Sequence, residues 1–276
     1  MVARHMLAYG TPVLAGVTPG KGGGSAEGVP VYDTVLEARE RHGVNTSLVY
    51  VPPAFVADAV LEACANGVEL VVVITENVPV HDALRMLNVA RAKGVTVIGP
   101  NCVGLISPAE RLKLGPIGGD NPSRCFVPGE VGVISRSGGM TAETAWLIKN
   151  AGYGVSTAVS IGGDALVGTE PKKLLALFEK DPRTRAVVTF SEPGTAFEEN
   201  MARFVQERGY TKPLICFVAG RFTETMPEGT VFGHAGAIIE GGAGKPSVKI
   251  ALLREAGAYV PDQYDDMVEV LRSVLG

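Results

Sequence analysis

The sequence predicts an α/β fold with two doubly wound parallel sheets, one in each half of the chain. Short apolar runs rich in β-branched residues alternate with longer amphipathic segments, which is the pattern of parallel strands joined by helical crossovers. The 276 residues exceed the usual size of one domain, so two α/β units are favoured over one. Glycine-rich turns follow most of the apolar runs. Because ligands gather beyond the carboxyl ends of parallel strands, these turns predict a binding cleft.

The first half of the chain supplies four predicted strands and one well-delimited helix. Apolar runs place the strands near residues 12–17, 46–51, 69–75 and 95–98. The helix begins at Thr34, whose spacing to Glu37 fits a capping box, and ends near Gly43, where a left-handed C-cap favours glycine. We predict a first domain over residues 1–107.

The second half repeats the alternation after an irregular stretch. Residues 108–129 contain prolines and glycines without a sustained period, and we predict that they form a linker. Helices are predicted over about 139–150 and 264–275. Strands are predicted near 131–134, 155–160, 186–190, 213–219 and 257–260. The second predicted domain therefore covers residues 130–276.

Composition excludes several classes of protein. The net charge is −4 and basic residues are scattered, so nucleic acid is not an expected partner. The longest apolar run, 68–75, is far below the roughly 20 residues that span a bilayer, and no secretory signal opens the chain. The cysteines form no CxxC pair, so we predict free thiols, no metal site and a cytoplasmic location. They are Cys64, Cys102, Cys125 and Cys216.

Small residues dominate the turns that follow the predicted strands, and one late segment carries an isolated histidine. In "VFGHAGAIIEGGAGKP" (231–246), His234 lies among glycines and alanines, which leave its ring exposed or facing a cavity. The turns are "VTPGKGG" (17–23), "ITENVP" (74–79), "GPNCVG" (99–104), "SRSGGMTAE" (135–143), "SIGGD" (160–164) and "SEPGT" (191–195).

Together these segments resemble the α subunit of the succinyl-CoA synthetase (succinate–CoA ligase) family, which includes the matching part of ATP-citrate lyase and citryl-CoA synthetase. The likeness follows the family's order through essentially the whole chain. It implies a CoA-binding Rossmann-like domain, then a flavodoxin-like ligase domain, in an ADP- or GDP-forming acid–CoA ligase. In that family ATP or GTP, with Mg²⁺, binds to a separate β subunit with an ATP-grasp fold. Consistently, this chain has no Walker A loop.

The resemblance also assigns roles to the residues of the second half. His234 would carry a phosphoryl group from the nucleotide to the bound acid, and Glu192 would accept a hydrogen bond from its other ring nitrogen. Small neighbours of the histidine would give the phosphate and the moving loop clearance, and a helix N-terminus would bind the phosphate. These are Gly233, Ala235 and Gly236 for clearance, and Ser137, Gly138 and Gly139 at the helix.

For CoA, the resemblance points to turns of the first half. Asn101 and Cys102 would lie near the thiol-bearing arm, and the nucleotide end would contact Pro19, Lys21, Ile74, Thr75 and Glu76. Each residue also has a simpler interpretation. A single histidine is more often structural, Lys21 alone would be a solvated side chain, and Glu192 could cap a helix because Thr195 to Glu198 also fits a capping box. Cys102 could be an ordinary small buried residue, and we do not expect it to be a nucleophile.

Two departures from the family pattern leave alternatives open. The chain matches the family only from the middle of its first helix, so a preceding strand and a glycine-rich CoA loop are missing from this sequence. We expect a truncated gene model; the alternatives are a weakened CoA site or no normal use of CoA. A non-catalytic CoA-binding paralogue is a further alternative, against which the presence of both His234 and Glu192 argues.

The second departure is Ala142, where succinate-using members usually carry tyrosine. Alanine removes a wall and a hydroxyl from the acid pocket, so we expect room for a bulkier acid. Succinate is the expected substrate by family frequency, and a citryl-CoA or malyl-CoA synthetase is the alternative. The identity of the acid, ATP against GTP, and heterodimer against heterotetramer stay open.

Overall fold

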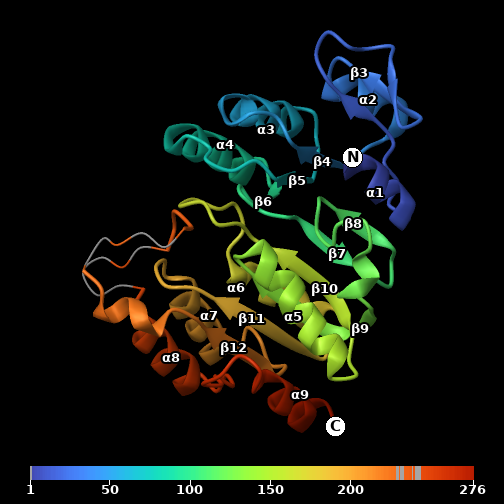
Figure 1. Ribbon diagram of the computed structural model, residues 1–276. Helices are drawn as coiled ribbons and strands as arrows, with labels where there is room; N and C mark the ends of the chain where they lie inside the picture. The colour runs from blue at the N-terminus through green and yellow to red at the C-terminus, as the bar shows by residue number, and fades with distance from the viewer. Residues whose placement is uncertain (1, 228–229, 231–232, 238, 240–243) are drawn as a thin grey trace.

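The computed structural model describes residues 2–227, 230, 233–237, 239 and 244–276. Val231, Phe232 and part of the segment after His234 therefore lie outside the described residues. The chain forms a smaller N-terminal region and a larger C-terminal region, drawn from blue to teal and from green to red in Figure 1. The predicted α/β class is confirmed, and the parallel pairing holds in both regions.

The N-terminal region opens with a small mixed sheet. Helix α1 (Val2–Tyr9) leads to β1 (Gly16–Val17), which pairs in parallel with β3 (Val29–Tyr32), while β2 (Ser25–Ala26) pairs antiparallel to β3. Of the predicted strand 12–17, only the last two residues form a strand.

Helix α2 (Val35–His42) confirms the local signals of the sequence. The Oγ1 of Thr34 accepts a hydrogen bond from the backbone N–H of Glu37, and Gly43 adopts a left-handed φ of 63°. The Glu37 carboxylate accepts from the backbone N–H of Asp33, one residue earlier than in an ideal capping box.

A second small sheet carries the alternation predicted for residues 46–98. It consists of three parallel strands in the order β4 (Thr46–Val49), β5 (Leu70–Val73) and β6 (Thr96–Ile98). Helices α3 (Val56–Ala65), which follows η1 (Pro53–Phe55), and α4 (Val80–Ala92) bury Val60 and Met86 against it. The other face shares a hydrophobic cluster with the C-terminal region through Val72 and Ile98.

The C-terminal region is built on one six-stranded sheet in the order β12-β11-β9-β10-β7-β8. Four consecutive strands, starting from the β12 edge, run in parallel: β9 (Pro128–Ser135), β10 (Val155–Ser160), β11 (Ala186–Ser191) and β12 (Leu214–Val218). Helices α5 (Gly138–Asn150) and α9 (Met267–Leu275) pack on one face, and α6 (Pro171–Lys180), α7 (Phe197–Gln206) and α8 (Pro246–Glu255) pack on the other. Figure 1 shows this layering around the sheet.

Two details of this sheet differ from the sequence-based expectation. Strands β7 (Leu105–Ser107) and β8 (Leu112–Leu114) join its edge in antiparallel pairing, so a strand lies inside the predicted linker 108–129, together with η2 (Pro122–Arg124). Residues 257–260 form no strand; a single bridge joins Ile215 to Tyr259. The division of the chain into domains at residues 107 and 130 stays a prediction.

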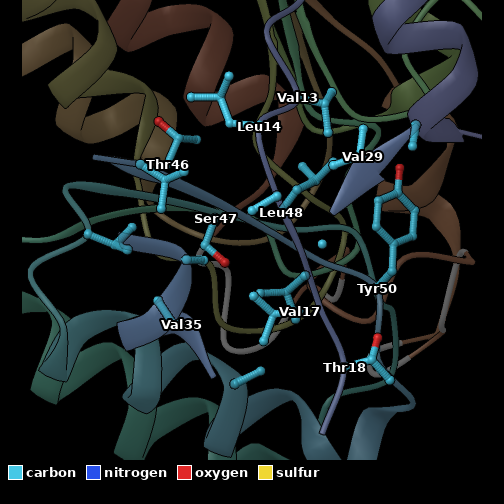
Figure 2. A pocket seen from close by; sticks show the side chains of 18 of the residues that line it. Val13, Leu14, Val17, Thr18, Val29, Val35, Thr46, Ser47, Leu48 and Tyr50 are labelled. Atoms are coloured by element: carbon cyan, nitrogen blue, oxygen red, sulfur yellow. The ribbon is translucent and has the colours of Figure 1, made fainter. Parts of the chain in front are cut away.

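A large apolar cavity separates the two small sheets of the N-terminal region. Its volume is about 1270 Å³, and it lies between the residues leading into β1 and those around β4. Figure 2 shows Val17, Val29 and Leu48, from three different strands, around this space. Among the described residues β1 and β4 do not pair with each other.

Candidate active site

His234 lies directly against the turn that follows β10. A Cβ atom added to Gly163 would come within 2.5 Å of the imidazole Cδ2, so only glycine permits this approach. The backbone N–H of Gly236 donates to the carbonyl of Gly163 at 3.3 Å and joins the two loops. The imidazole is 30% exposed. The small residues of both segments therefore allow close packing of the loops around an accessible ring.

Glu192 forms a hydrogen bond with the histidine. It is the first residue after β11, and its Oε2 lies 2.8 Å from Nδ1 of His234. This hydrogen bond raises the pKa of His234 above its ordinary value, opposed by partial burial and by the charge of Arg136. Because a carboxylate can only accept, the proton of the neutral ring is held on Nδ1 and the lone pair is placed on Nε2. The hydrogen bond therefore fixes the tautomer of the neutral ring.

Arg136 is a residue of the site that sequence reasoning missed. It is 3% exposed, and its Nε and Nη2 donate to the carbonyls of Gly162, Gly163 and Asp164 at 3.3, 3.3 and 3.1 Å. Its buried Nη1 has no hydrogen-bond partner within the described part of the chain. The guanidinium also packs so closely on Gly236 that a Cβ there would lie 2.1 Å from Nη2. The turn "SRSGGMTAE" contained the signal, a charged residue directly after a buried strand.

Asp164 joins the two regions beside this cluster. Its carboxylate accepts from the backbone N–H groups of Asn77 and Val78 at 3.4 and 3.2 Å. Nearby, the carbonyl of Asn101 accepts from Gly163, and that of Thr75 accepts from Asn101. Three of the predicted turns, 74–79, 99–104 and 160–164, thus meet at one place next to His234.

Helix α5 begins in the turn 135–143, where the sequence predicted a helix N-terminus. Ser137 is the N-cap residue, its Oγ accepts from the N–H of Met140, and Gly138 and Gly139 form the first turn. A Cβ on Gly138 would lie 2.5 Å from Val103, whereas Gly139 is exposed. Arg136 directly precedes this turn and connects it to the loop of His234. No group of three or more potential metal ligands lies within the described residues.

The predicted CoA residues are divided between two places. Ile74, Thr75, Glu76, Asn101 and Cys102 belong to the turns beside His234, whereas Pro19 and Lys21 are exposed in the turn after β1. In Figure 1 the β1–β3 sheet stands apart from the C-terminal region.

One predicted CoA residue, Cys102, and the predicted pocket residue, Ala142, take part in packing. Cys102 is buried and donates to the carbonyl of Val73, and burial raises its pKa to about 12, so the thiol stays protonated. Ala142 is half-buried on α5 and packs on the cluster that contains Ala145 and Ile148.

Each half of the chain matches a known protein family. Residues 1–77 match the CoA binding domain, and residues 128–274 match the succinyl-CoA ligase like flavodoxin domain. Over 271 residues the chain is 46% identical to the succinate–CoA ligase [ADP-forming] subunit alpha 2 of Archaeoglobus fulgidus, covering 98% of this chain and 91% of that protein. The chain belongs to the succinate–CoA ligase α-subunit family.

Other similar proteins differ in the acid that their names specify. The malate–CoA ligase subunit alpha of Methylorubrum extorquens is 43% identical over 265 residues, which cover 94% of this chain and 86% of that subunit. The ATP citrate lyase of Methanosaeta concilii, solved with (3S)-citryl-CoA, superposes with a TM-score of 0.84 at 29% identity. That match covers 89% of this chain and 41% of the lyase chain. Family membership therefore confirms the predicted class, a subunit of an acid–thiol ligase, without selecting the acid.

Proposed function

We propose that this chain is the α subunit of an ADP-forming acid–CoA ligase in which Nε2 of His234 carries the phosphoryl group. The observation that supports this most strongly is the 2.8 Å contact between Nδ1 and Glu192, which leaves Nε2 as the nucleophile. The ring is accessible, and its neighbours in both loops are small. A buried structural histidine would not need either property.

The reaction would proceed in three transfers. Nε2 attacks the terminal phosphorus of the nucleotide, and the nucleoside diphosphate leaves. A carboxylate oxygen of the acid then attacks the phosphorus, the N–P bond breaks, and an acyl phosphate forms. Finally the CoA thiolate attacks the acyl carbon and inorganic phosphate leaves. Glu192 stabilises the cationic phosphorylated ring in the first step, and holds the proton on Nδ1 when the phosphoryl group leaves Nε2 in the second.

The phosphorylated histidine needs donors for its new negative charge. Arg136 has a buried Nη1 without a partner among the described residues, and the first turn of α5 offers free N–H groups. We assign Ser137, Gly138 and Gly139 to the phosphate, together with the backbone of residues 233–236. These assignments extend the family resemblance.

Family membership supports the proposed partners. The relatives are named as α subunits, so a β subunit is implied, and we propose that it has an ATP-grasp fold and binds ATP or GTP with Mg²⁺. For CoA we assign Pro19, Lys21, Ile74, Thr75, Glu76, Asn101 and Cys102. No helix in the described part of the chain has the length and apolar character of a membrane span, and we propose a cytoplasmic enzyme.

The acid is proposed to be a di- or tricarboxylate, with succinate first and malate or citrate as the alternatives. The malate-specific name of one relative and the citryl-CoA complex of another favour testing all three. The turnover of Ala142→Tyr across these acids tests the pocket directly. Selective loss of citrate or malate turnover would support a wall at this position, whereas unchanged ratios would remove Ala142 from the pocket.

Radiolabelling tests the phosphoryl carrier. With its β subunit and γ-labelled ATP, the chain should gain an acid-labile, base-stable phosphate that His234→Ala abolishes. His81→Ala, on the exposed surface of α4, is the matched control and should label normally. Persistent label in His234→Ala would reject the proposed carrier.

A further inference from the structure

We propose that Lys249 is a positioning residue that fixes the loop presenting Glu192 to His234. Lys249 lies on α8 and is fully buried. Its ammonium donates to the carbonyl of Glu192 at 3.1 Å, to the carbonyl of Gly194 at 2.5 Å, and to Oε2 of Glu198. An ammonium has three N–H donors, and these three oxygens satisfy all of them.

The loop held by this lysine needs support from outside. Gly194 and Thr195 both have left-handed backbones, with φ of 76° and 54°. This conformation is sterically strained for Thr195, whereas glycine adopts it without strain. Pro193 removes one backbone donor from the loop. Because Lys249 binds the carbonyls on both sides of Pro193, it fixes the direction in which Glu192 leaves β11.

The same contacts connect the two halves of the catalytic pair. Helix α8 directly follows the segment that carries His234, and Gly244 before it accepts a hydrogen bond from the N–H of Gly194 at 2.9 Å. A Cβ on Gly244 would lie 2.6 Å from the Cα of Gly194. Lys249 therefore fastens the Glu192 loop to the helix at which the His234 segment ends.

Glu198 makes this buried position possible. It lies in the first turn of α7 and is 2% exposed. Because water does not reach this position, the carboxylate of Glu198 compensates the charge of the Lys249 ammonium. Removing one partner of a buried pair leaves an uncompensated charge, which is strongly destabilising. A test of positioning must therefore separate the charge balance from the two hydrogen bonds to the loop.

The test is an NMR titration of the His234 imidazole in the chain alone, with labelling of the α–β complex as a second measurement. In Lys249→Met we expect the His234 pKa to fall toward its ordinary value of about 6.5, because Glu192 no longer faces Nδ1. The rate of phosphorylation should fall roughly tenfold, the effect typical of losing a group that orients a functional histidine. Only the labelling measurement rests on the proposed function; the titration reports the loop geometry independently.

Lys212→Met is the matched control. Lys212 also donates to two backbone carbonyls, those of Phe178 and Asp181 at 2.6 and 2.7 Å, but it precedes β12 at the opposite end of the sheet. This variant should leave both the His234 pKa and the phosphorylation rate unchanged. An equal loss in both lysine variants would indicate a general effect on stability and would overturn the proposal.

A double variant, Lys249→Met with Glu198→Met, removes the charge imbalance while still lacking the two hydrogen bonds to the loop. We expect it to fold, as measured by circular dichroism, and to keep the lowered His234 pKa. A pKa restored to that of the unsubstituted chain would mean that Lys249 only neutralises Glu198. Failure of both variants to fold would assign Lys249 to the fold as a whole. Either result would overturn the positioning role.

Discussion

The C-terminal region closes a single six-stranded sheet between two layers of helices, whereas the N-terminal region places two three-stranded sheets around a cavity of about 1270 Å³. This closed C-terminal region contains His234, Glu192, Arg136 and Lys249. Some residues assigned to CoA lie beside the closed region. The others lie on the outer sheet, which is the small sheet β1-β3-β2. The groups that we propose for phosphoryl transfer, which would need a fixed geometry, are thus built on a packed sheet, while the outer sheet carries exposed turns such as that of Lys21.

The largest expected contrast is in the free energy of unfolding after the same substitution in each region. Leu175 on α6 is fully buried, and Leu175→Ala should cost about 2–5 kcal/mol because it leaves a cavity in a packed core. Leu14 lines the existing cavity and is 44% exposed, so Leu14→Ala should stay within about 0.5 kcal/mol. Urea unfolding measures both values. Equal losses would show that the N-terminal cavity is packed as tightly as the core.

Removing the charge of Glu192 should perturb the closed region chemically without unfolding it. Glu192→Gln should slow phosphorylation about 10–100-fold, because the amide no longer supports the charged ring. Glu255→Gln, on the exposed side of α8, is the control and should label at the normal rate. An unchanged rate in Glu192→Gln would remove the orienting role of the carboxylate.

The raised pKa of His234 also predicts a pH dependence of stability. Protonated His234 stabilises the folded chain fully below pH about 6.5, and this contribution is lost as the pH rises through the higher folded pKa. The difference in unfolding free energy between the unsubstituted chain and Glu192→Gln should therefore be larger at about pH 5.5, below the ordinary histidine pKa, than at about pH 8, above it. A difference that grows with pH would contradict the assigned hydrogen bond.

Amide hydrogen exchange should distinguish the two regions under native conditions. Strands β9 and β11 each have a paired neighbour on both sides, whereas β1 is paired only with β3 among the described residues. We expect amides of β1 and β3 to exchange at least about tenfold faster, since local opening there exposes few buried contacts. Similar protection in β1 and β9 would show that the outer sheet is stabilised beyond its visible pairing.

The smallest expected effect concerns the outer turn. Lys21→Ala should weaken CoA binding, measured by calorimetry, by about 1 kcal/mol or less, the usual range for an exposed ionic contact. Phosphorylation of His234 should not change. A loss of phosphorylation in this variant would break the functional separation of the two regions.

The sequence correctly predicted features that depend on interactions between neighbouring residues. The signals at Thr34 and Gly43 delimited α2 correctly because capping involves only neighbours in the chain. Thr195 and Glu198 fit the same capping pattern, yet α7 begins with Ala196 as its N-cap, and the Glu198 carboxylate turns to Lys249. A contact from a residue 51 positions away overrode the local pattern.

What the sequence did not predict depends on distant backbone groups. Arg136 and Lys249 are buried because carbonyls of turns far along the chain surround them, which no periodicity records. Strands β7 and β8 were missed because each is only three residues long and pairs antiparallel at the sheet edge. Residues 257–260 looked like a strand because they are apolar, but only Tyr259 meets β12.

The most direct test of the central claim is heteronuclear NMR of the phosphorylated, nitrogen-labelled chain. The 2.8 Å contact between Nδ1 and Glu192 predicts that phosphorus couples to Nε2 of His234 while Nδ1 keeps its proton. Coupling of phosphorus to Nδ1, or to any residue other than His234, would contradict the assignment of Nε2 as the phosphoryl carrier.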